Sequence, residues 1–302
     1  MENDLSLGAA WMNGTVIPIS QAAIPVNDWG LVHSDITYDV VPVIDGAFFR
    51  FDEYLARFLS SMADLHLDPG MSKRDIQAAL HQMVGESNLR DSYVAMVCSR
   101  GKPKIAGSRD PRDCDNHFFA WCVPYVHVIK PEVVEQGATA WIAQNAYRIP
   151  ENSVNPLVKN YHWGDFTQGI FEAKDKDYET VILLDYDGNV TEGPGFNVFA
   201  VKDKVLITPD RGVLAGVSRK TVLEMAEHLG INTSIRSLSV EELLEADEVF
   251  LSSSGGGVIP IIRVNETIFG NGASGPISVQ LNKTYWTWTT LEKYRDPIDY
   301  AL

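Results

Sequence analysis

Two hairpin signals near the start of the chain constrain its fold more than any other feature. Asn13-Gly14 lies between the apolar positions of the run 11–16, and Asp45-Gly46 separates the apolar stretch 40–44 from Phe48-Phe49. Asn-Gly and Asp-Gly between apolar runs are typical of tight turns that join two antiparallel strands. The first half of the chain is therefore expected to begin with antiparallel strand pairs.

A helix is expected directly after these strands. Apolar residues recur at helical spacing from Leu55 to Leu65. Asp52 is the expected N-cap of this helix, and Pro69-Gly70 is the expected stop. The other elements expected in the first half are a helix over 72–84, strands over 93–98 and 117–123, and a long surface loop over 101–116.

Strands and helices alternate again in the second half, which predicts an α+β protein with mixed sheets. Pro124 and Pro131 flank a candidate boundary. We therefore expect a small N-terminal domain over 1–126, a linker over 127–134 and a larger C-terminal domain over 135–302. The expected strands are 141–143, 181–185, 197–201, 205–208 and 249–252, and the expected helices are 163–174, 217–229, 241–245 and 282–294.

The charge and cysteine content exclude several classes of function. The formal net charge of −15 disfavours nucleic acid and anionic membrane surfaces as partners, because like charges repel. Cys98, Cys114 and Cys122 include no CxxC pair, so neither a disulfide framework nor a zinc site is expected. The N-terminus from Met1 to Asp4 lacks the pattern of a signal peptide, and no apolar stretch reaches membrane-spanning length. We therefore expect a cytoplasmic protein.

Lys159 and Glu192 are the first candidates for chemistry. Lys159 follows the apolar run 156–158, where a charged ammonium is costly unless it is paired or gives up its proton. A lysine in such a place can bind a carbonyl cofactor as a Schiff base, although taken alone it is more often an ordinary lysine that reaches solvent. Glu192 lies between a strand and the bend 193–195 and could keep a pyridine nitrogen protonated. Taken alone, Glu192 is more often a turn residue.

Two segments have the composition of anion sites. Residues 212–219 lead directly into a helix, where backbone N–H groups and the Ser218 hydroxyl can bind an anion. Residues 252–257 end a strand with serines and glycines, which let backbone amides approach a phosphate. Arg57 on the first expected helix could add positive charge. Each feature is weak alone, because glycine-rich turns are common and an arginine on a helix usually faces solvent.

The segment 33–40 is unusually rich in polar residues, with His33, Asp35 and Tyr38 among them. A Ser-His-Asp triad is a poor interpretation, because three sequence neighbours do not easily adopt triad geometry. His33 and Asp35 are also too few to form a metal site. The ordinary interpretation is a polar turn that enters a strand.

Taken together and in this order, these features resemble the class IV aminotransferases, the fold type IV enzymes of pyridoxal phosphate. The resemblance extends from Val16 to Pro297 and rests on the segments 33–40, 158–165, 191–197 and 208–214. Within the family, the closest likeness is to the (R)-selective amine transaminases, and the segment 33–40 distinguishes them best. Branched-chain and D-amino-acid aminotransferases have Gly- and Glu-bearing versions of this segment. The resemblance implies a two-domain α+β fold, with a smaller N-terminal α/β domain and a larger C-terminal domain with a β-barrel-like core.

The resemblance also implies roles for single residues. Lys159 would bind pyridoxal 5'-phosphate and move a proton between substrate and cofactor carbons, and Glu192 would pair with the pyridine nitrogen. Residues that would hold the phosphate are Arg57, Val217, Ser218 and Ser254, and Leu214 would pack on the ring. Residues that would shape the substrate pocket are His33, Tyr38, Val40 and Trp163. The carboxylate of a keto acid would be bound by Arg109 on the long loop, or else by Arg100 or Arg112.

The sequence departs from the family pattern in two places. Ser252-Ser253-Ser254 stands where threonines are usual, which keeps the hydroxyl groups. Tyr161-His162 replaces an apolar-polar pair, which is expected to alter the depth of the pocket.

The function implied by the resemblance is transfer of the amino group of an (R)-amine to a keto acid such as pyruvate. Both partners are small molecules, and the family usually forms homodimers. Three alternatives remain open: a branched-chain or D-amino-acid aminotransferase, a lyase that acts on an aminodeoxychorismate-like compound, and a binding protein without catalysis. The presence of both Lys159 and Glu192 speaks against the last alternative.

Overall fold

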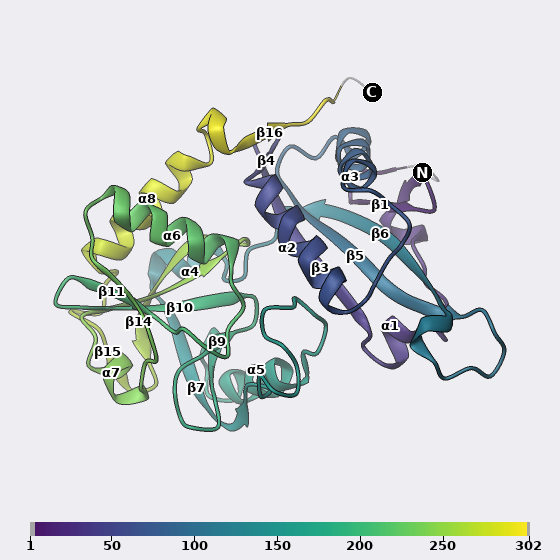
Figure 1. Cartoon of the computed structure of the whole chain (residues 1–302). Helices are drawn as coiled ribbons and strands as arrows, with labels where there is room; N and C mark the ends of the chain where they lie inside the picture. The colour runs from purple at the N-terminus through teal and green to yellow at the C-terminus, as the bar shows by residue number, and fades with distance from the viewer. Residues whose placement is uncertain (1–3, 301–302) are drawn as a thin grey trace. The chain divides into compact units, whose positions relative to one another are not determined.

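The two hairpins that the turn signals predicted are both present, and both belong to the first sheet (Figure 1). The computed structural model describes residues 4–300, so Met1–Asn3, part of the stretch judged to lack a signal peptide, lies outside the described range. Strand β1 (Ala9–Met12) pairs with β2 (Thr15–Pro18), and β3 (Ile36–Ile44) pairs with β4 (Ala47–Phe49). Both residues of each turn have positive φ, the geometry that matches the twist of a hairpin.

Within residues 4–300, the first sheet has seven strands in the order β16-β4-β3-β5-β6-β1-β2, and every neighbouring pair is antiparallel. Helix α2 packs against β3, and α3 packs against β1 and β6. The remaining elements around this sheet are η1 (Ile19–Gln21), α1 (Trp29–Val32), α2 (Phe51–Asp64), α3 (Lys73–Ser87), β5 (Ser92–Pro103), η2 (Pro111–Asp113), β6 (Cys114–Pro124), η3 (Glu292–Tyr294) and β16 (Arg295–Pro297).

The second sheet, again counted among the described residues, has nine strands and is mixed. Its main order is β12-β11-β10-β13-β14-β7-β8, and β7 pairs in parallel with both β14 and β8. Its strands are β7 (Ala138–Tyr147), β8 (Thr180–Leu184), β9 (Glu192–Gly193), β10 (Phe196–Lys202), β11 (Val205–Thr208), β12 (Thr233–Ile235), β13 (Glu248–Ser253), β14 (Gly257–Val264) and β15 (Thr267–Ile268). Its helices are α4 (Pro131–Gln136), α5 (Gly164–Lys174), α6 (Val217–His228), α7 (Val240–Leu244) and α8 (Pro276–Trp288). The predicted α+β class with mixed sheets is thus confirmed.

The two sheets belong to two compact units. The N-terminal unit comprises the described residues up to Val126, the short segment 158–162 and the residues from Leu291 onward. The second unit comprises His127–Leu157 and Trp163–Thr290. A buried apolar cluster on the second sheet, with Ile182, Val198 and Leu251 among its members, forms a core of the second unit. None of the helices within residues 4–300 combines the length and apolar composition that a membrane crossing requires.

The start of α2 and the long loop differ from expectation. The N-cap of α2 is Arg50, with φ of 57°, and not Asp52. The reason is tertiary: the backbone N–H of Arg50 donates to the carbonyl of Tyr294, and its guanidinium bonds Glu53. The loop expected over 101–116 is shorter, because β5 and β6 continue their pairing beyond a register shift as far as Pro103 and Cys114.

The last helix also differs from expectation, since α8 covers Pro276–Trp288 and not 282–294. The carboxylate of Glu248 on β13 accepts hydrogen bonds from the backbone N–H groups of Ile277 and Ser278, at 3.0 and 2.8 Å. A carboxylate at this place satisfies donors of the first helical turn and so fixes where the helix begins. The cap is supplied by a distant strand, and the local signal at this end of the helix is Pro276 in its first turn.

Candidate active site

The segment 158–162 lies beside the first residues of β3, which do not pair with β4. The Thr37 hydroxyl donates to the carbonyl of Lys159 at 2.6 Å, and the Tyr38 N–H donates to the same carbonyl at 3.3 Å. Thr37 and Asn160 also form an antiparallel bridge. The Lys159 Nζ atom lies 4.6 Å from the centroid of the Tyr38 ring, within cation–π distance. The lysine backbone is therefore fixed by β3, and its amine lies over an aromatic ring.

An apolar, largely aromatic surface extends from this ring across the first sheet. Ile36, Tyr38 and Val40 alternate along β3 and so share one face, together with Ala95 and Val97 of β5. Tyr38 stacks on Tyr161 with ring centroids 4.1 Å apart. Further rings packed against this surface are those of Tyr93, Phe119 and Trp121. We call this set the aromatic wall. It contains the predicted pocket residues Tyr38 and Val40, and it adds Tyr161, Tyr93, Phe119 and Trp121.

Arg57 is held from the opposite face of β3. Asp39 alternates with Tyr38 along the strand, and its carboxylate accepts from Nε and Nη2 of Arg57 at 2.8 and 2.7 Å. Burial alone would lower the pKa of Arg57, but the charge and hydrogen bonds of Asp39 outweigh burial and raise that pKa. Arg57 therefore stays charged, with its guanidinium oriented by a bidentate ion pair.

The three arginines considered for carboxylate binding, Arg100 of β5, Arg109 and Arg112 of η2, differ in the contacts that they make. Arg100 is buried and bonds both oxygens of Asp35, at 2.8 and 3.0 Å, as well as the carbonyls of Leu65 and His66. Arg112 pairs with its neighbour Asp110. Arg109 is exposed, and it forms no hydrogen bond or ion pair with any other residue in the described range. Of the three candidates, Arg109 has the guanidinium that is least committed to the fold.

His33 and Trp163 each end or begin a short structural element. His33 is the C-cap of α1, and its ring stands edge-on to Trp29 with centroids 4.5 Å apart. Trp163 is the N-cap of α5, and its ring packs against Phe166 at 5.4 Å. His33 lies in the N-terminal unit and Trp163 in the second unit.

Glu192 is buried in the second unit and is held by several donors. Its Oε2 accepts from the backbone N–H of Leu214 at 2.9 Å and from the Asn197 amide at 3.4 Å. Its Oε1 accepts from Nε of Arg148 at 3.1 Å. The Asn197 amide also donates to the carbonyl of Leu214 at 3.0 Å, so Leu214 is fixed by the same network. A buried carboxylate bound in this way keeps one orientation.

Arg148 and Asp165 lie around Glu192 and were not among the predicted site residues. Nη1 of Arg148 donates to Oδ2 of Asp165 at 2.7 Å, while Nε of Arg148 bonds Glu192. Asp165 stands in a segment on which the family resemblance rests, but Arg148 carries no sequence signal. Only the fold shows that one guanidinium bridges these two carboxylates, which belong to separate segments of the chain.

The start of α6 has the features of an anion site. The helix begins at Val217 and Ser218, and its N-cap, Gly216, provides no side-chain cap. A Cβ atom at Gly216 would lie 2.2 Å from Oδ1 of Asn197, so this close approach requires glycine. Backbone N–H groups in the first turn of a helix are suited to an anion such as a phosphate.

The serine-glycine segment after β13 is related to α6 through Tyr285 of α8. The Ser218 hydroxyl lies 3.5 Å from the Tyr285 hydroxyl, and a Cβ atom at Gly257 would lie 2.7 Å from the Tyr285 ring. The buried Ser252 hydroxyl has no hydrogen-bond partner within the described chain. An unpaired buried hydroxyl is costly, and a bound phosphate is a suitable acceptor. The predicted residue Ser254 is half-buried and is the first residue after β13.

The structure therefore groups the predicted residues in two sets. Lys159, Arg57, Tyr38, Val40 and His33 lie in the N-terminal unit together with Arg109. The set in the second unit comprises Glu192, Leu214, Val217, Ser218, Ser254 and Trp163.

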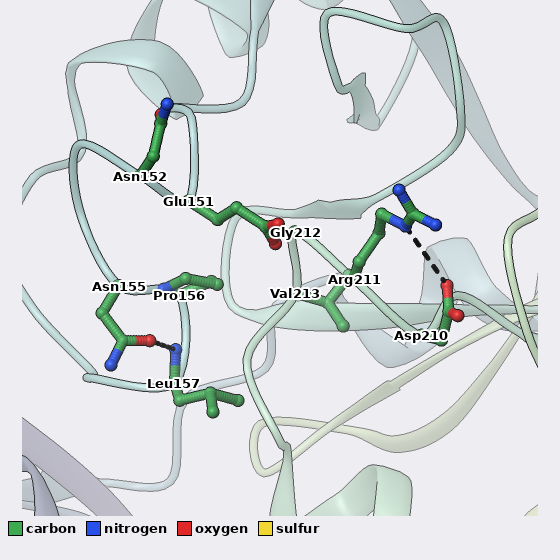
Figure 2. A pocket seen from close by; sticks show the side chains of 9 residues that line it. All are labelled: Glu151, Asn152, Asn155, Pro156, Leu157, Asp210, Arg211, Gly212 and Val213. Atoms are coloured by element: carbon green, nitrogen blue, oxygen red, sulfur yellow. Dashed lines mark hydrogen bonds and ion pairs between the residues drawn. The ribbon is translucent and has the colours of Figure 1, made fainter.

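A cavity of about 420 Å³ opens in the second unit (Figure 2). It lies between residues 151–157, which lead to Lys159 in the sequence, and residues 210–213, which lead to Leu214. Figure 2 shows the guanidinium of Arg211 directed toward Asp210, with Nε and Oδ1 3.9 Å apart. Among the described residues that line this cavity, none was predicted as a site residue.

Comparison with known proteins gives a consistent result. Residues 37–264 match the family model described as amino-transferase class IV. The chain is 28% identical over 278 residues to a putative branched-chain-amino-acid aminotransferase of Methanocaldococcus jannaschii, covering 91% of this chain and 94% of that protein. It is 29% identical over 273 residues to D-alanine aminotransferase of Bacillus licheniformis, covering 88% and 92%. The fold matches the crystal structure of a T.th. branched-chain amino acid aminotransferase with pyridoxamine 5'-phosphate, at a TM-score of 0.90 and 23% identity, covering 97% and 99% of the two chains.

Proposed function

The chain belongs to the class IV aminotransferases, and on that premise we propose that it transfers the amino group of a donor with an apolar substituent to a keto acid such as pyruvate. The observation that carries the proposal is the aromatic wall beside the Lys159 amine. A surface of stacked rings and aliphatic side chains favours an apolar substituent over a charged one, because burial of an unpaired charge is costly. Donors with acidic or basic substituents are expected to react slowly.

The cofactor of this family is pyridoxal phosphate, and the residues of the chain fit it. When bound, it supplies an electron-withdrawing ring that stabilises negative charge on the substrate carbon. The uncapped start of α6 and the unpartnered Ser252 hydroxyl are suited to a phosphate. Arg57, Val217, Ser218 and Ser254 would hold that phosphate, Leu214 would pack on the ring, and Glu192 would pair with the pyridine nitrogen. Nζ of Lys159 would take a proton from one carbon and return it to another.

The named relatives support an amino acid as the donor. They are branched-chain and D-alanine aminotransferases, and both kinds match nearly the whole chain. A branched-chain side chain or a D-alanine methyl group would suit the aromatic wall. Of the two donor classes considered for this protein, amino acids are the better supported by the comparisons.

A specific segment supports an (R)-amine as the donor. The residues from His33 to Val40 are those by which the chain resembles (R)-selective amine transaminases, and they place Tyr38 and Val40 in the aromatic wall. An amine without a carboxylate and a keto acid with one must then use the same pocket in turn. A buried arginine would be left unpaired by the amine, whereas the exposed Arg109 can remain in solvent until the keto acid binds.

A comparison of donors in the first half-reaction separates these possibilities. The purified protein is mixed with (R)-1-phenylethylamine, (S)-1-phenylethylamine, D-alanine or L-leucine, and the absorbance of the bound cofactor is followed. Fast conversion by the (R)-amine alone would establish the amine donor, and much faster conversion by D-alanine or L-leucine would establish the amino acid. Borohydride reduction followed by peptide mapping is expected to place the label on Lys159, and a label on another lysine would contradict the site.

The role of Arg109 is tested by replacement with alanine. Arg109→Ala is expected to raise KM for pyruvate and to leave KM for the amine unchanged, because only the keto acid has a carboxylate. Arg112→Ala is the matched control, since Arg112 is on the same loop but is paired with Asp110. Unchanged pyruvate kinetics in Arg109→Ala would remove that residue from the proposal.

Release of pyruvate without any amino acceptor would indicate a lyase instead.

We further propose that the protein acts in the cytoplasm as a homodimer, which rests on the family and on the lack of a disulfide or zinc pattern among its cysteines. Analytical ultracentrifugation of the purified protein tests the dimer.

A further inference from the structure

Glu192 is the first member of a buried chain of charges that continues beyond it. Nε of Arg148 donates to Glu192 at 3.1 Å, and Nη1 of Arg148 donates to Asp165 at 2.7 Å. The side chains of Arg148 and Asp165 are only 10% and 6% exposed. Two carboxylates therefore share one guanidinium in a place where solvent screens their charges weakly.

Every link in this chain is held on a rigid element. Arg148 directly follows β7, its backbone N–H bonds the Leu184 carbonyl at 2.8 Å, and its guanidinium lies 4.4 Å from the centroid of the Phe166 ring. Asp165 is in the first turn of α5, where it accepts from the backbone N–H groups of Ile149 and Phe166. Neither partner can move without breaking these contacts, so Arg148 offers Glu192 a donor in a fixed position.

The sharing of the guanidinium also matters for the charge at Glu192. An arginine paired with Glu192 alone would neutralise it and weaken its attraction for a cation. Asp165 takes up part of the positive charge of Arg148, so Glu192 keeps more of its negative charge. Arg219 also interacts with Glu192: burial lowers the pKa of Arg219, and Glu192 and Asp210 oppose that change. Arg219 is itself engaged by the Thr208 hydroxyl and the Pro209 carbonyl, at 3.2 and 2.6 Å.

We propose that Arg148 and Asp165 are positioning residues that fix the orientation and the negative charge of Glu192, and so set how strongly the protein binds a protonated heterocyclic nitrogen. The proposal rests on the proposed function, in which Glu192 pairs with the pyridine nitrogen of the cofactor. It goes beyond that function because it assigns the strength of this pairing to Arg148 and Asp165, which have no role in the proposed function.

The test compares pyridoxal phosphate with its 1-deaza analogue, in which carbon replaces the ring nitrogen. The cofactor is removed from the full chain, and the Kd of each compound is measured by absorbance titration. The wild-type protein is expected to prefer pyridoxal phosphate. In Asp165→Asn this preference is expected to fall about tenfold, the loss that accompanies weakening of one charge-assisted hydrogen bond. A general defect in the fold would weaken the binding of both compounds equally and leave the ratio of their Kd values unchanged.

Two further variants and a control make the outcome decisive. Arg148→Lys keeps the charge but replaces the rigid planar fork of the guanidinium with a flexible ammonium, so it is expected to lower the ratio as Asp165→Asn does. It also serves if Asp165→Asn fails to fold. Glu248→Gln is the control, because Glu248 is also buried and accepts from backbone N–H groups, but at α8. It is expected to reduce stability and to leave the ratio unchanged.

Glu192→Gln separates failure of this inference from failure of the proposed function. If Glu192→Gln abolishes the preference while Asp165→Asn and Arg148→Lys keep it, the positioning role is overturned and Glu192 retains its proposed role. If Glu192→Gln itself keeps the preference, Glu192 does not pair with the ring nitrogen, and both proposals fail at that point. If Asp165→Asn and Arg148→Lys weaken the binding of both compounds equally, the positioning role is also overturned.

Discussion

At the scale of single residues, Asp39 shows how the fold uses both faces of one strand. Tyr38 and Val40 belong to the aromatic wall, whereas Asp39 between them bonds Arg57 of α2. The sequence identified Tyr38, Val40 and Arg57 as site residues but assigned Asp39 no role. Strand alternation predicts that Asp39 faces the other way, but it does not predict which cation lies there.

Replacement of Asp39 by asparagine is expected to destabilise the protein strongly. The side chain of Asp39 is fully buried, so the variant would leave the Arg57 guanidinium buried without its anion. Loss of one partner of a buried ion pair typically costs about 3–5 kcal/mol. Urea unfolding of the cofactor-free protein measures this cost in the free energy of unfolding.

The double variant Asp39→Asn with Arg57→Met is the control for this prediction. Removal of both charges is expected to recover much of the lost free energy, because no unpaired charge remains. If Asp39→Asn alone unfolds at the wild-type urea concentration, the ion pair contributes nothing and the interpretation of this face is wrong.

At the scale of elements, the sequence predicted what depends on near neighbours. Turn residues such as Asn13-Gly14 predicted the hairpins, and α3 begins where a helix was expected, after Ser72, which forms a capping box with Asp75. The elements that were misplaced depend on distant residues. The N-cap of α2, Arg50, is bound by the Tyr294 carbonyl, and the first turn of α8 is capped by the distant Glu248. No local pattern contains such information.

The same reasoning explains how much of the site could be found from the sequence. Lys159, Glu192 and the start of α6 are weak signals when taken alone, but their order along the chain gave the family resemblance that assigned their roles. Arg148 did not, since its importance comes from contacts with Glu192 and Asp165 across the fold. The Thr37 contact to the Lys159 backbone joins residues 122 positions apart and was equally invisible.

The start of α6 yields a prediction at the scale of an element. Gly216→Ala is expected to destabilise the second unit by about 1–3 kcal/mol, because the new methyl group would overlap Oδ1 of Asn197 and push aside the residue that orients Leu214. Thermal unfolding followed by circular dichroism measures the effect.

Gly164→Ala is the matched control, since Gly164 also opens a helix, α5. A Cβ atom at Gly164 would meet no other atom of the described residues within 4 Å. Alanine is expected to be neutral there or to stabilise by about 0.4–1 kcal/mol. Equal losses in the two variants would show that the tight contact at Gly216 is not the cause.

At the scale of the whole molecule, the N-terminal unit is completed by residues from the far end of the chain. Strand β16 pairs with β4 at the edge of the first sheet, and the Tyr294 carbonyl accepts from the Arg50 N–H at 2.7 Å. The Tyr300 hydroxyl donates to the Leu89 carbonyl at 3.0 Å, and the Arg90 guanidinium lies 4.0 Å from the centroid of the Tyr300 ring. Composition and periodicity cannot show such a return of the chain, because nothing in the sequence of β16 indicates which strand it pairs with.

A chain that stops after Thr290 is expected to keep its second unit and to lose protection in the first sheet. Without β16, the backbone groups of β4 lose their outer hydrogen-bond partners. Hydrogen–deuterium exchange should then speed up in β4 and at the start of α2, with peptides from β10 and β13 as internal controls. Unchanged exchange in β4 would mean that β16 adds nothing to the stability of the sheet.

The late arrival of β16 has a consequence for synthesis on the ribosome. Phe48 leaves the ribosome long before its partner Asp296 has been translated. At about 5–20 residues per second, the β4 edge waits roughly 10–50 s for the strand that covers it. An uncovered edge is a template for pairing with other nascent polypeptides, so aggregation during translation should depend on chaperone supply and on the speed at which the last part of the message is read.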